Sequence, residues 1–175
     1  MHEKNESSGS GSGSNSDFDE LLENLQAEIL KEEQEIYTER TLKEAYNPKN
    51  VGELKNPGGA ARVTGSCGDT MQIHLKVKVN VKEDLSDKIV DCKFITDGCG
   101  ASVACGSVIT ELVKGKTIGE ALMLTPERIL AVLGGLPEEN IHCAALAVDT
   151  LKAAIANYSH SSNKLQIMNH ESSRD

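Results

Sequence analysis

Three of the five cysteines in this 175-residue chain stand in settings that suit metal binding or sulfur chemistry. Cys67 lies in Gly-Ser-Cys-Gly-Asp, Cys99 in Asp-Gly-Cys-Gly-Ala and Cys143 in Ile-His-Cys-Ala. Two of them have a second metal-capable neighbour, Asp69 and His142. Thiolates combined with a carboxylate or an imidazole form a soft metal site with one harder, more labile ligand. Such a ligand set favours a cluster that is held for delivery.

The predicted positions of these thiols favour their ionised form. Cys99 lies between two glycines where a strand passes into a helix, and Cys143 lies at the start of the last predicted helix. Unpaired amide groups and the helix dipole favour a thiolate at such positions. Gly68, next to Cys67, lets the backbone approach a bound group closely. The chain has no Cys-x-x-Cys pair, which argues against zinc-ribbon and thioredoxin folds, and spacing alone leaves open whether the thiols share one site.

The elements that must position these residues form strands first and helices afterwards. Residues 71–81 alternate strictly between apolar and polar, which predicts a strand with one buried and one wet face. Shorter strands are expected over 62–64 and 89–96. This order predicts an α+β fold in which a three-stranded antiparallel sheet has helices packed on one face. Helices are expected over 36–46 and 101–114, from the capping box Thr117-Ile118-Gly119-Glu120, from Thr125-Pro126 to Gly134, and over 143–158.

Both ends of the chain differ from this body in composition. Residues 1–16 are expected to be a flexible Ser/Gly linker, and residues 159–175 a disordered tail. Residues 17–36 are predicted to form an acidic amphipathic helix, because Phe18, Leu22 and Leu25 recur at helical spacing with acids opposite. Two interpretations of this extension stay open: a solvated helix packed loosely on its own domain, or a helix that docks a partner.

The acidity of the chain is concentrated in this N-terminal extension. The net charge is −9, but up to Ala45 there are twelve acidic and four basic residues, against fifteen and fourteen beyond. The nearly neutral body has no basic footprint for nucleic acid. An odd number of cysteines without a signal-peptide pattern favours a reducing compartment over a disulfide framework. No apolar run is long enough to cross a bilayer, so a cytoplasmic protein is expected.

Five short motifs, in this order, resemble the IscU family of iron–sulfur cluster assembly scaffolds, which includes the N-terminal domain of NifU. The resemblance runs over residues 37–158 and implies a cluster assembled at one tip of the domain. It implies that Cys67, Asp69, Cys99 and Cys143 bind the cluster and that His142 joins them as a metal ligand. The motifs are Asn47-Pro48-Lys49-Asn50-Val51-Gly52, Cys67-Gly68-Asp69, Asp97-Gly98-Cys99-Gly100-Ala101-Ser102, Leu136-Pro137 and His142-Cys143.

The resemblance also implies an activity and a set of partners. Family members are scaffolds rather than enzymes: they accept persulfide sulfur from a cysteine desulfurase, bind Fe²⁺, build a transient [2Fe–2S] cluster and transfer it to recipient apoproteins. Apo members commonly hold Zn²⁺, frataxin-like and ferredoxin partners are expected, and a homodimer that bridges one cluster is an open alternative. We favour Cys143 over Cys67 and Cys99 as the persulfide acceptor, because His142 can exchange protons near neutral pH.

Departures from the family pattern limit some of these expectations. The segment Leu136-Pro137-Glu138-Glu139-Asn140 replaces a Leu-Pro-Pro-Val-Lys sequence, which argues against docking of a dedicated Hsp70 chaperone. The alternative function is a zinc-dependent sulfurtransferase of the SufU kind, against which His142 argues, and a structural zinc protein is a third class. Residues 82–88 form a longer loop than the family pattern. We expect Cys92 and Cys105 to be core residues and His74 to be solvated on the polar face of its strand.

Overall fold

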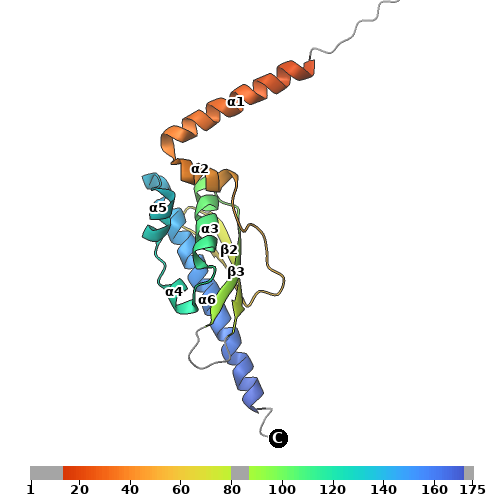
Figure 1. The fold of residues 1–175 in the computed structure, drawn as a ribbon, viewed down its shortest axis with the longest axis vertical. Coiled ribbons are helices and arrows are strands. Elements are labelled where there is room, and N and C mark those ends of the chain that lie inside the picture. The colour runs from red at the N-terminus through yellow and green to blue at the C-terminus, as the bar shows by residue number, and fades with distance from the viewer. Residues whose placement is uncertain (1–13, 80–86, 172–175) are drawn as a thin grey trace, which may run out of the picture. The chain divides into compact units, whose positions relative to one another are not determined.

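The computed structural model describes residues 14–79 and 87–171 (Figure 1). It divides into two compact units, Met1–Ile36 and Tyr37–Asp175. The first unit contains helix α1 (Ser14–Ile36), and every other element belongs to the second. Residues 1–13 and 80–86 are outside the described part of the chain, and so are most of the expected Ser/Gly linker and of the loop at 82–88.

The sheet of the second unit is an antiparallel meander of three strands, β1 (Gly59–Thr64), β2 (Thr70–Lys78) and β3 (Lys88–Thr96), with β2 in the centre. Met71, Ile73 and Leu75 are fully buried, so the alternation predicted for β2 is confirmed on its inner face. Ile73 pairs with Ala61 of β1 and Phe94 of β3, at the centre of the sheet. The α+β fold class predicted from the sequence is thereby confirmed.

Local sequence signals explain where most helices begin and end. Thr117 and Glu120 form a reciprocal capping box at the start of α4. Pro126 occupies the first turn of α5, and Gly134 ends that helix in the left-handed conformation, with φ of 80°. The helices of the second unit are α2 (Glu39–Tyr46), α3 (Gly100–Val113), α4 (Ile118–Leu122), α5 (Pro126–Leu133), the short 3₁₀ helix η1 (Glu138–Asn140) and α6 (Ile141–Glu171).

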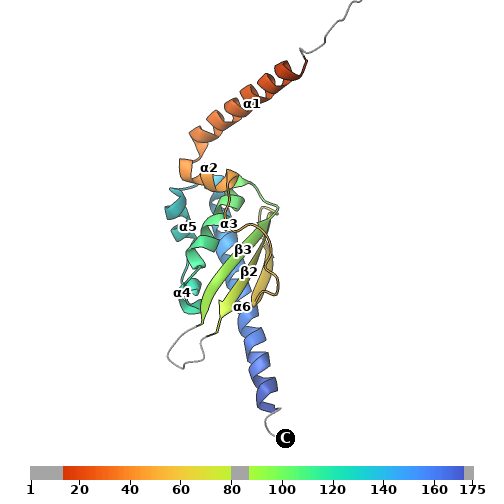
Figure 2. The same cartoon turned by 45° about the vertical axis from the view of Figure 1, so that its right-hand side comes forward.

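One apolar layer lies between the sheet and the helices. Helix α6 packs on β1 and β2, and α3 packs on β3, so both cover the same face of the sheet (Figure 2). Gly59 lets α6 approach closely, because a Cβ there would lie 2.7 Å from the Cβ of Tyr158. None of the helices over 14–79 and 87–171 has the length and apolar content that crossing a bilayer demands.

The outer face of the sheet is partly covered by the segment between α2 and β1. The amide of Gly52 donates to the Phe94 carbonyl at 2.8 Å, which lays this segment along the edge of β3. The Leu54 amide then donates to Nδ1 of His74 at 3.2 Å, and His74 is only 5% exposed. The prediction of a solvated His74 is therefore wrong, because a loop far away in sequence covers a strand position that alternation marks as wet.

The last helix is longer than its apolar stripe suggests. The sequence predicts a helix end near Tyr158 and a disordered tail over 159–175. Instead α6 continues to Glu171, and residues 172–175 lie outside the described part of the chain. Residues 159–171 contain neither glycine nor proline, so they carry no signal that stops a helix. At its packed part, the Tyr158 hydroxyl donates to the Asp87 carboxylate at 2.6 Å.

Candidate metal centre

A tight turn between β1 and β2 presents the first two candidate ligands. The Gly65 amide donates to the Asp69 carbonyl at 2.8 Å, and the Gly68 amide donates back to the Gly65 carbonyl at 3.1 Å. Gly68 has a φ of +92°, a conformation that a side chain would strain. The turn therefore folds back on itself, with Cys67 exposed at its tip and Asp69 at the entrance to β2.

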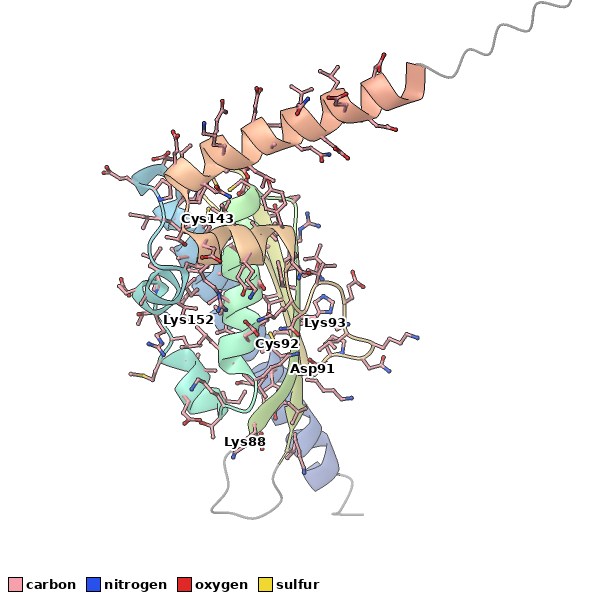
Figure 3. All side chains as sticks on the ribbon, turned by 45° about the horizontal axis from the view of Figure 1, so that its top comes forward. Lys88, Asp91, Cys92, Lys93, Cys143 and Lys152 are labelled. Atoms are coloured by element: carbon pink, nitrogen blue, oxygen red, sulfur yellow. The ribbon has the colours of Figure 1, made fainter. Side chains whose placement is uncertain are left out.

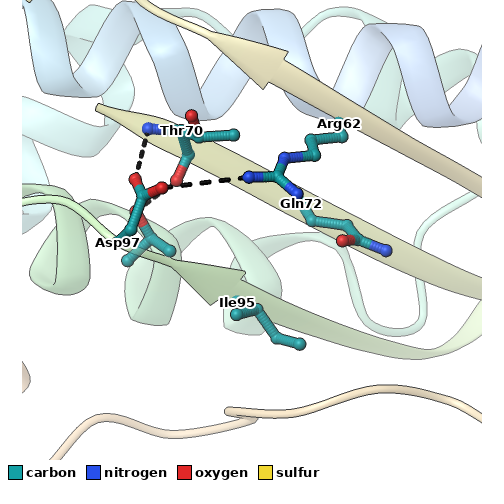
Figure 4. A pocket seen from close by; sticks show the side chains of 6 residues that line it. Arg62, Thr70, Gln72, Ile95 and Asp97 are labelled. Atoms are coloured by element: carbon teal, nitrogen blue, oxygen red, sulfur yellow. Dashed lines mark hydrogen bonds and ion pairs between the residues drawn. The ribbon is translucent and has the colours of Figure 1, made fainter. Parts of the chain in front are cut away.

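Hydrogen bonds to Thr70 join this turn to the end of β3 (Figure 4). The Thr70 amide donates to Oδ1 of Asp97 at 2.6 Å, and the Thr96 hydroxyl donates to the Thr70 carbonyl at 2.8 Å. Arg62 lies 3.9 Å from the other oxygen of Asp97. These contacts border a small hollow of about 140 Å³. They hold residue 69 beside residue 99, although the two are 30 positions apart in the sequence.

The Asp69 carboxylate accepts hydrogen bonds from the first turn of α3. The Ser102 hydroxyl donates to Oδ2 at 2.7 Å, and the Cys99 amide donates to the same oxygen at 3.3 Å. The Ser102 hydroxyl, more than any other group, lowers the pKa of Asp69 below its ordinary value, and the Cys99 amide adds to this against partial burial. Gly98 permits the approach, because a Cβ there would lie 2.8 Å from the carboxyl carbon of Asp69.

Two sulfur atoms and this carboxylate converge on one point. Cys99 Sγ lies 4.0 Å from Cys143 Sγ, and potential ligand atoms of Asp69, Cys99 and Cys143 all lie within 4.8 Å of one another. Two thiolates on one tetrahedral zinc ion, each at about 2.3 Å, are separated by about 3.8 Å. The observed sulfur separation therefore fits a shared ion with almost no movement. The donor set also suits iron, which clusters hold through thiolates.

Cys143 contradicts the expectation that a helix start favours its thiolate. It is the third residue of α6 and its side chain is fully buried against the core. Burial is the main reason why the pKa of the Cys143 thiol rises to about 12, and the nearby Cys99 raises it further. The cost of burying a charged thiolate thus exceeds the stabilisation that a helix start gives it. A bound cation would lower the pKa of Cys143 again, because metal binding expels the thiol proton.

The other two predicted ligands lie beside this group without joining it. His142 Nε2 lies 3.7 Å from Cys143 Sγ, so the imidazole contacts a ligand sulfur. Cys67 is exposed on the same turn as Asp69, but its sulfur is not among the clustered atoms. Of the five residues that the resemblance named, the structure brings three together and places His142 in contact with one of them.

Three contacts around the site have no counterpart in the sequence prediction. Ser102 holds Asp69, as described above. The Asn140 amide nitrogen lies 3.9 Å from Cys99 Sγ, and the Tyr37 hydroxyl donates to Oδ1 of Asn140 at 2.9 Å. Ser102 could have been found from its spacing, because it follows Cys99 by three residues on one helix face. The link from Tyr37 to Asn140 spans 103 residues and has no local signal.

The remaining two cysteines are core residues, as the sequence predicted. Cys92 and Cys105 are fully buried. Burial raises the pKa of Cys92 to about 12 and raises that of Cys105 even more strongly. Cys92 lies on β3, apart from Cys143 at the start of α6 (Figure 3). The thiols of Cys92 and Cys105 are therefore kept protonated and inaccessible.

Comparison with known proteins places this arrangement in a family. The family model "NifU-like N terminal domain" matches residues 36–165. The chain is 40% identical over 131 residues to iron–sulfur cluster assembly scaffold protein IscU 1 of Archaeoglobus fulgidus, covering 74% of this chain and 81% of that protein. It is 43% identical to the IscU scaffold protein of Aquifex aeolicus over 123 residues, covering 70% of this chain and 75% of that one.

Solved structures share the same fold. A crystal structure from Fervidobacterium islandicum, named as a candidate scaffold protein of the SUF system, superposes with a TM-score of 0.54 at 25% identity. The superposition covers 68% of this chain and 96% of the Fervidobacterium chain. An N-terminal NifU-like structure from Brucella abortus superposes with a TM-score of 0.52 at 22% identity, covering 71% and 95%. The chain belongs to the family of NifU-like N-terminal domains.

Proposed function

We propose that this protein is a scaffold on which an iron–sulfur cluster is assembled and from which it is passed on. The observation that carries the proposal is the convergence of Asp69, Cys99 and Cys143 ligand atoms within 4.8 Å. The relatives named as cluster assembly scaffolds support the same role. The cluster is cargo, so the protein acts by holding and releasing it rather than by turning over a substrate.

The ligand set suits temporary binding. Thiolates of Cys99 and Cys143 bind iron strongly, and Cys67 is exposed on an adjacent turn, where it can supply a third sulfur. The Asp69 carboxylate is a harder ligand, and its lowered pKa keeps it ionised. His142, in contact with Cys143, can take the place of the carboxylate. The proposed cargo is a [2Fe–2S] cluster, and Zn²⁺ fits the same donors in the apo protein.

Sulfur has to arrive from a second protein. We propose a cysteine desulfurase whose persulfide is attacked at its outer sulfur by a thiolate of this chain. A new S–S bond forms on the scaffold, the old S–S bond breaks, and the desulfurase leaves as a thiolate. Each transferred sulfur then needs two electrons to become sulfide, for which a ferredoxin-type donor is the proposed source. Recipient apoproteins and a frataxin-like protein complete the proposed set of partners.

Burial changes the argument about the persulfide acceptor. The sequence favours Cys143 because His142 beside it can exchange protons near neutral pH, but the Cys143 side chain is fully buried. Transfer to Cys143 therefore requires the first turn of α6 to move, whereas Cys67 and Cys99 are exposed. Cys143 stays the proposed acceptor only in such an opened form. Mass spectrometry after a brief reaction with a persulfidated desulfurase decides which thiol gains 32 Da first.

Reconstitution tests the scaffold function directly. The purified chain is incubated without oxygen with iron, cysteine and a cysteine desulfurase, and visible absorption and metal content are recorded. We expect the charge-transfer bands of a [2Fe–2S] cluster, lost on Cys99→Ala and kept on Cys92→Ala, which removes a thiol outside the site. Bands of equal strength in both variants would contradict the proposal. Tightly bound zinc with persulfide and no chromophore would instead support the sulfurtransferase alternative.

A further inference from the structure

Helix α1 carries an apolar stripe that is exposed along its length. Its 23 residues include six exposed large apolar side chains that recur at helical spacing. Phe18 is 59% exposed and Ile29 is 53% exposed. The family match begins at residue 36, so nearly all of this helix lies outside the matched region. The six side chains, here called the α1 stripe, are Phe18, Leu21, Leu22, Leu25, Ile29 and Ile36.

The spacing of the stripe is that of a helix that packs along another helix. Phe18, Leu22, Leu25 and Ile29 are separated by four, three and four residues, which is the alternation of core positions in a heptad repeat. Position 32, which continues the pattern, is a glutamate. In proteins most of the stability of a helix comes from packing of its amphipathic face, so a partner along the stripe would stabilise α1.

Charge decides what kind of helix fits there. The positions that flank the heptad core are Asp19, Gln26 and Glu33 on one side and Leu21, Glu28 and Glu35 on the other, so four of the six are acidic. Within α1 the only basic residue is Lys31, which lies away from the stripe. A second copy of α1 would bring acidic flanks against acidic flanks and place two Glu32 side chains, rather than one, in the shared core. A helix with basic flanks would instead meet opposite charge on both sides.

We propose that α1 docks an amphipathic helix of a partner protein, one with an apolar stripe flanked by lysine and arginine. The apolar side chains supply contact area, and the acidic flanks select the partner and set its register. The helix would recruit a protein to the scaffold without using the cluster ligands. The inference does not depend on which cargo the domain carries.

A pair of synthetic peptides tests this inference on the full chain. Both have about four heptads with leucine at the core positions; one has lysine and arginine at the flanking positions, and the other has glutamate there. Binding is measured by fluorescence anisotropy at low and at physiological salt. We expect the basic peptide to bind at least about tenfold more tightly than the acidic peptide, with the difference narrowing as salt rises.

Matched variants localise the binding. The double variant Leu25→Gln with Ile29→Gln removes stripe residues while keeping helix propensity, and should weaken the basic peptide at least about tenfold. Leu30→Gln is the control, because Leu30 is also apolar and 40% exposed but lies off the stripe. Cluster reconstitution should be the same in all three proteins. Equal binding of both peptides, or equal loss in the control, would overturn the proposal.

Two further results would replace the proposed occupant. A dimer in sedimentation that Leu25→Gln with Ile29→Gln dissociates would assign the stripe to a second copy of the chain. Strong protection of the α1 amides from hydrogen exchange in the monomer, lost in the same variant, would assign it to the protein's own domain. Either result contradicts a partner helix.

Discussion

The thiols of the candidate metal centre and the thiols of the core are the same chemical group in opposite environments. Cys99 is exposed, directly precedes α3 and lies within reach of a carboxylate, an amide and a second sulfur. Cys92 is fully buried in the core between the sheet and the helices, and burial raises the pKa of its thiol to about 12. Position, rather than residue type, therefore separates a ligand from a packing residue.

Cys143 combines features of both regions. It is as buried as Cys92, yet its sulfur lies 4.0 Å from Cys99 Sγ. The site therefore has one accessible sulfur, that of Cys99, and one shielded sulfur, that of Cys143, which becomes accessible only when the first turn of α6 moves. The comparison between the two regions thus predicts graded rather than uniform reactivity among the five cysteines.

The largest expected effect is in alkylation by iodoacetamide. Under native conditions Cys67 and Cys99 should react at least about 100-fold faster than Cys92 and Cys105, because the latter must wait for the fold to open. Tryptic mass spectrometry after short pulses gives the rate for each cysteine. Cys143 sharpens the comparison: we expect it to follow the core thiols. If Cys92 were labelled as fast as Cys99, the distinction between the regions would fail.

Two glycine substitutions should separate damage to the core from damage to the site. A Cβ at Gly106 would lie within 3.0 Å of the Phe94 ring, so Gly106→Ala should cost about 1–3 kcal/mol of unfolding free energy while keeping the cluster. A Cβ at Gly98 would lie 2.7 Å from the Ser102 Cβ and 2.8 Å from the Asp69 carboxyl carbon. Gly98→Ala should therefore lower cluster yield severalfold and change stability by less than about 1 kcal/mol.

Urea unfolding and reconstitution, measured on both glycine variants, check this pair of expectations. Loss of the cluster in Gly106→Ala at full stability, or a large stability loss in Gly98→Ala with normal cluster yield, would reverse the assignment.

Alkaline pH should destabilise the core. In the unfolded chain a cysteine ionises above about pH 8.5, whereas folded Cys92 keeps its proton up to about pH 12. The unfolded state then binds fewer protons, so stability falls as pH rises, by about 1.4 kcal/mol per pH unit for this thiol. Urea unfolding at pH 8, 9 and 10 measures the slope. The slope should become smaller in Cys92→Ala; an unchanged slope would show that Cys92 titrates normally in the fold.

The smallest expected effect concerns the carboxylate ligand. Asp69→Ala removes the hard ligand, so its [2Fe–2S] cluster should last severalfold longer and transfer more slowly to an apo-ferredoxin. The decay of visible absorption and the transfer rate are measured in parallel. Ser102→Ala is the control, because it removes the hydroxyl that donates to Asp69 and keeps the carboxylate as a potential ligand. A cluster in Asp69→Ala that decays as fast as the wild-type cluster would contradict the role of this ligand.

Elements with strong local signals were predictable from the sequence. The reciprocal cap of Thr117 and Glu120, the end of α5 at Gly134 and the inner face of β2 all depend on residues close in the chain. Burial at a particular position does not depend on neighbouring residues alone, because distant segments can cover it. His74 is covered by a segment whose Leu54 lies 20 residues away, and Cys143 is buried because α6 faces the core at its third residue.

The candidate site shows the same division. Motif spacing drew attention to Asp69, Cys99 and Cys143, and the backbone bonds of Thr70 explain how the first two meet. The exclusion of Cys67 from the clustered atoms depends on the shape of one turn. Asn140, which contacts Cys99, accepts a hydrogen bond from Tyr37, 103 residues away in the sequence. Neither follows from spacing.

The separation of the ligands along the chain has a thermodynamic consequence. Asp69 and Cys99 are 30 residues apart and Cys99 and Cys143 are 44 apart. Any cargo bound by all three residues therefore cross-links segments that are distant in the sequence. A ligand that binds only the folded form raises the free energy of unfolding. The cluster-bound protein is thus more stable against unfolding than the apo protein, and each transfer of the cluster returns the scaffold to the less stable apo form.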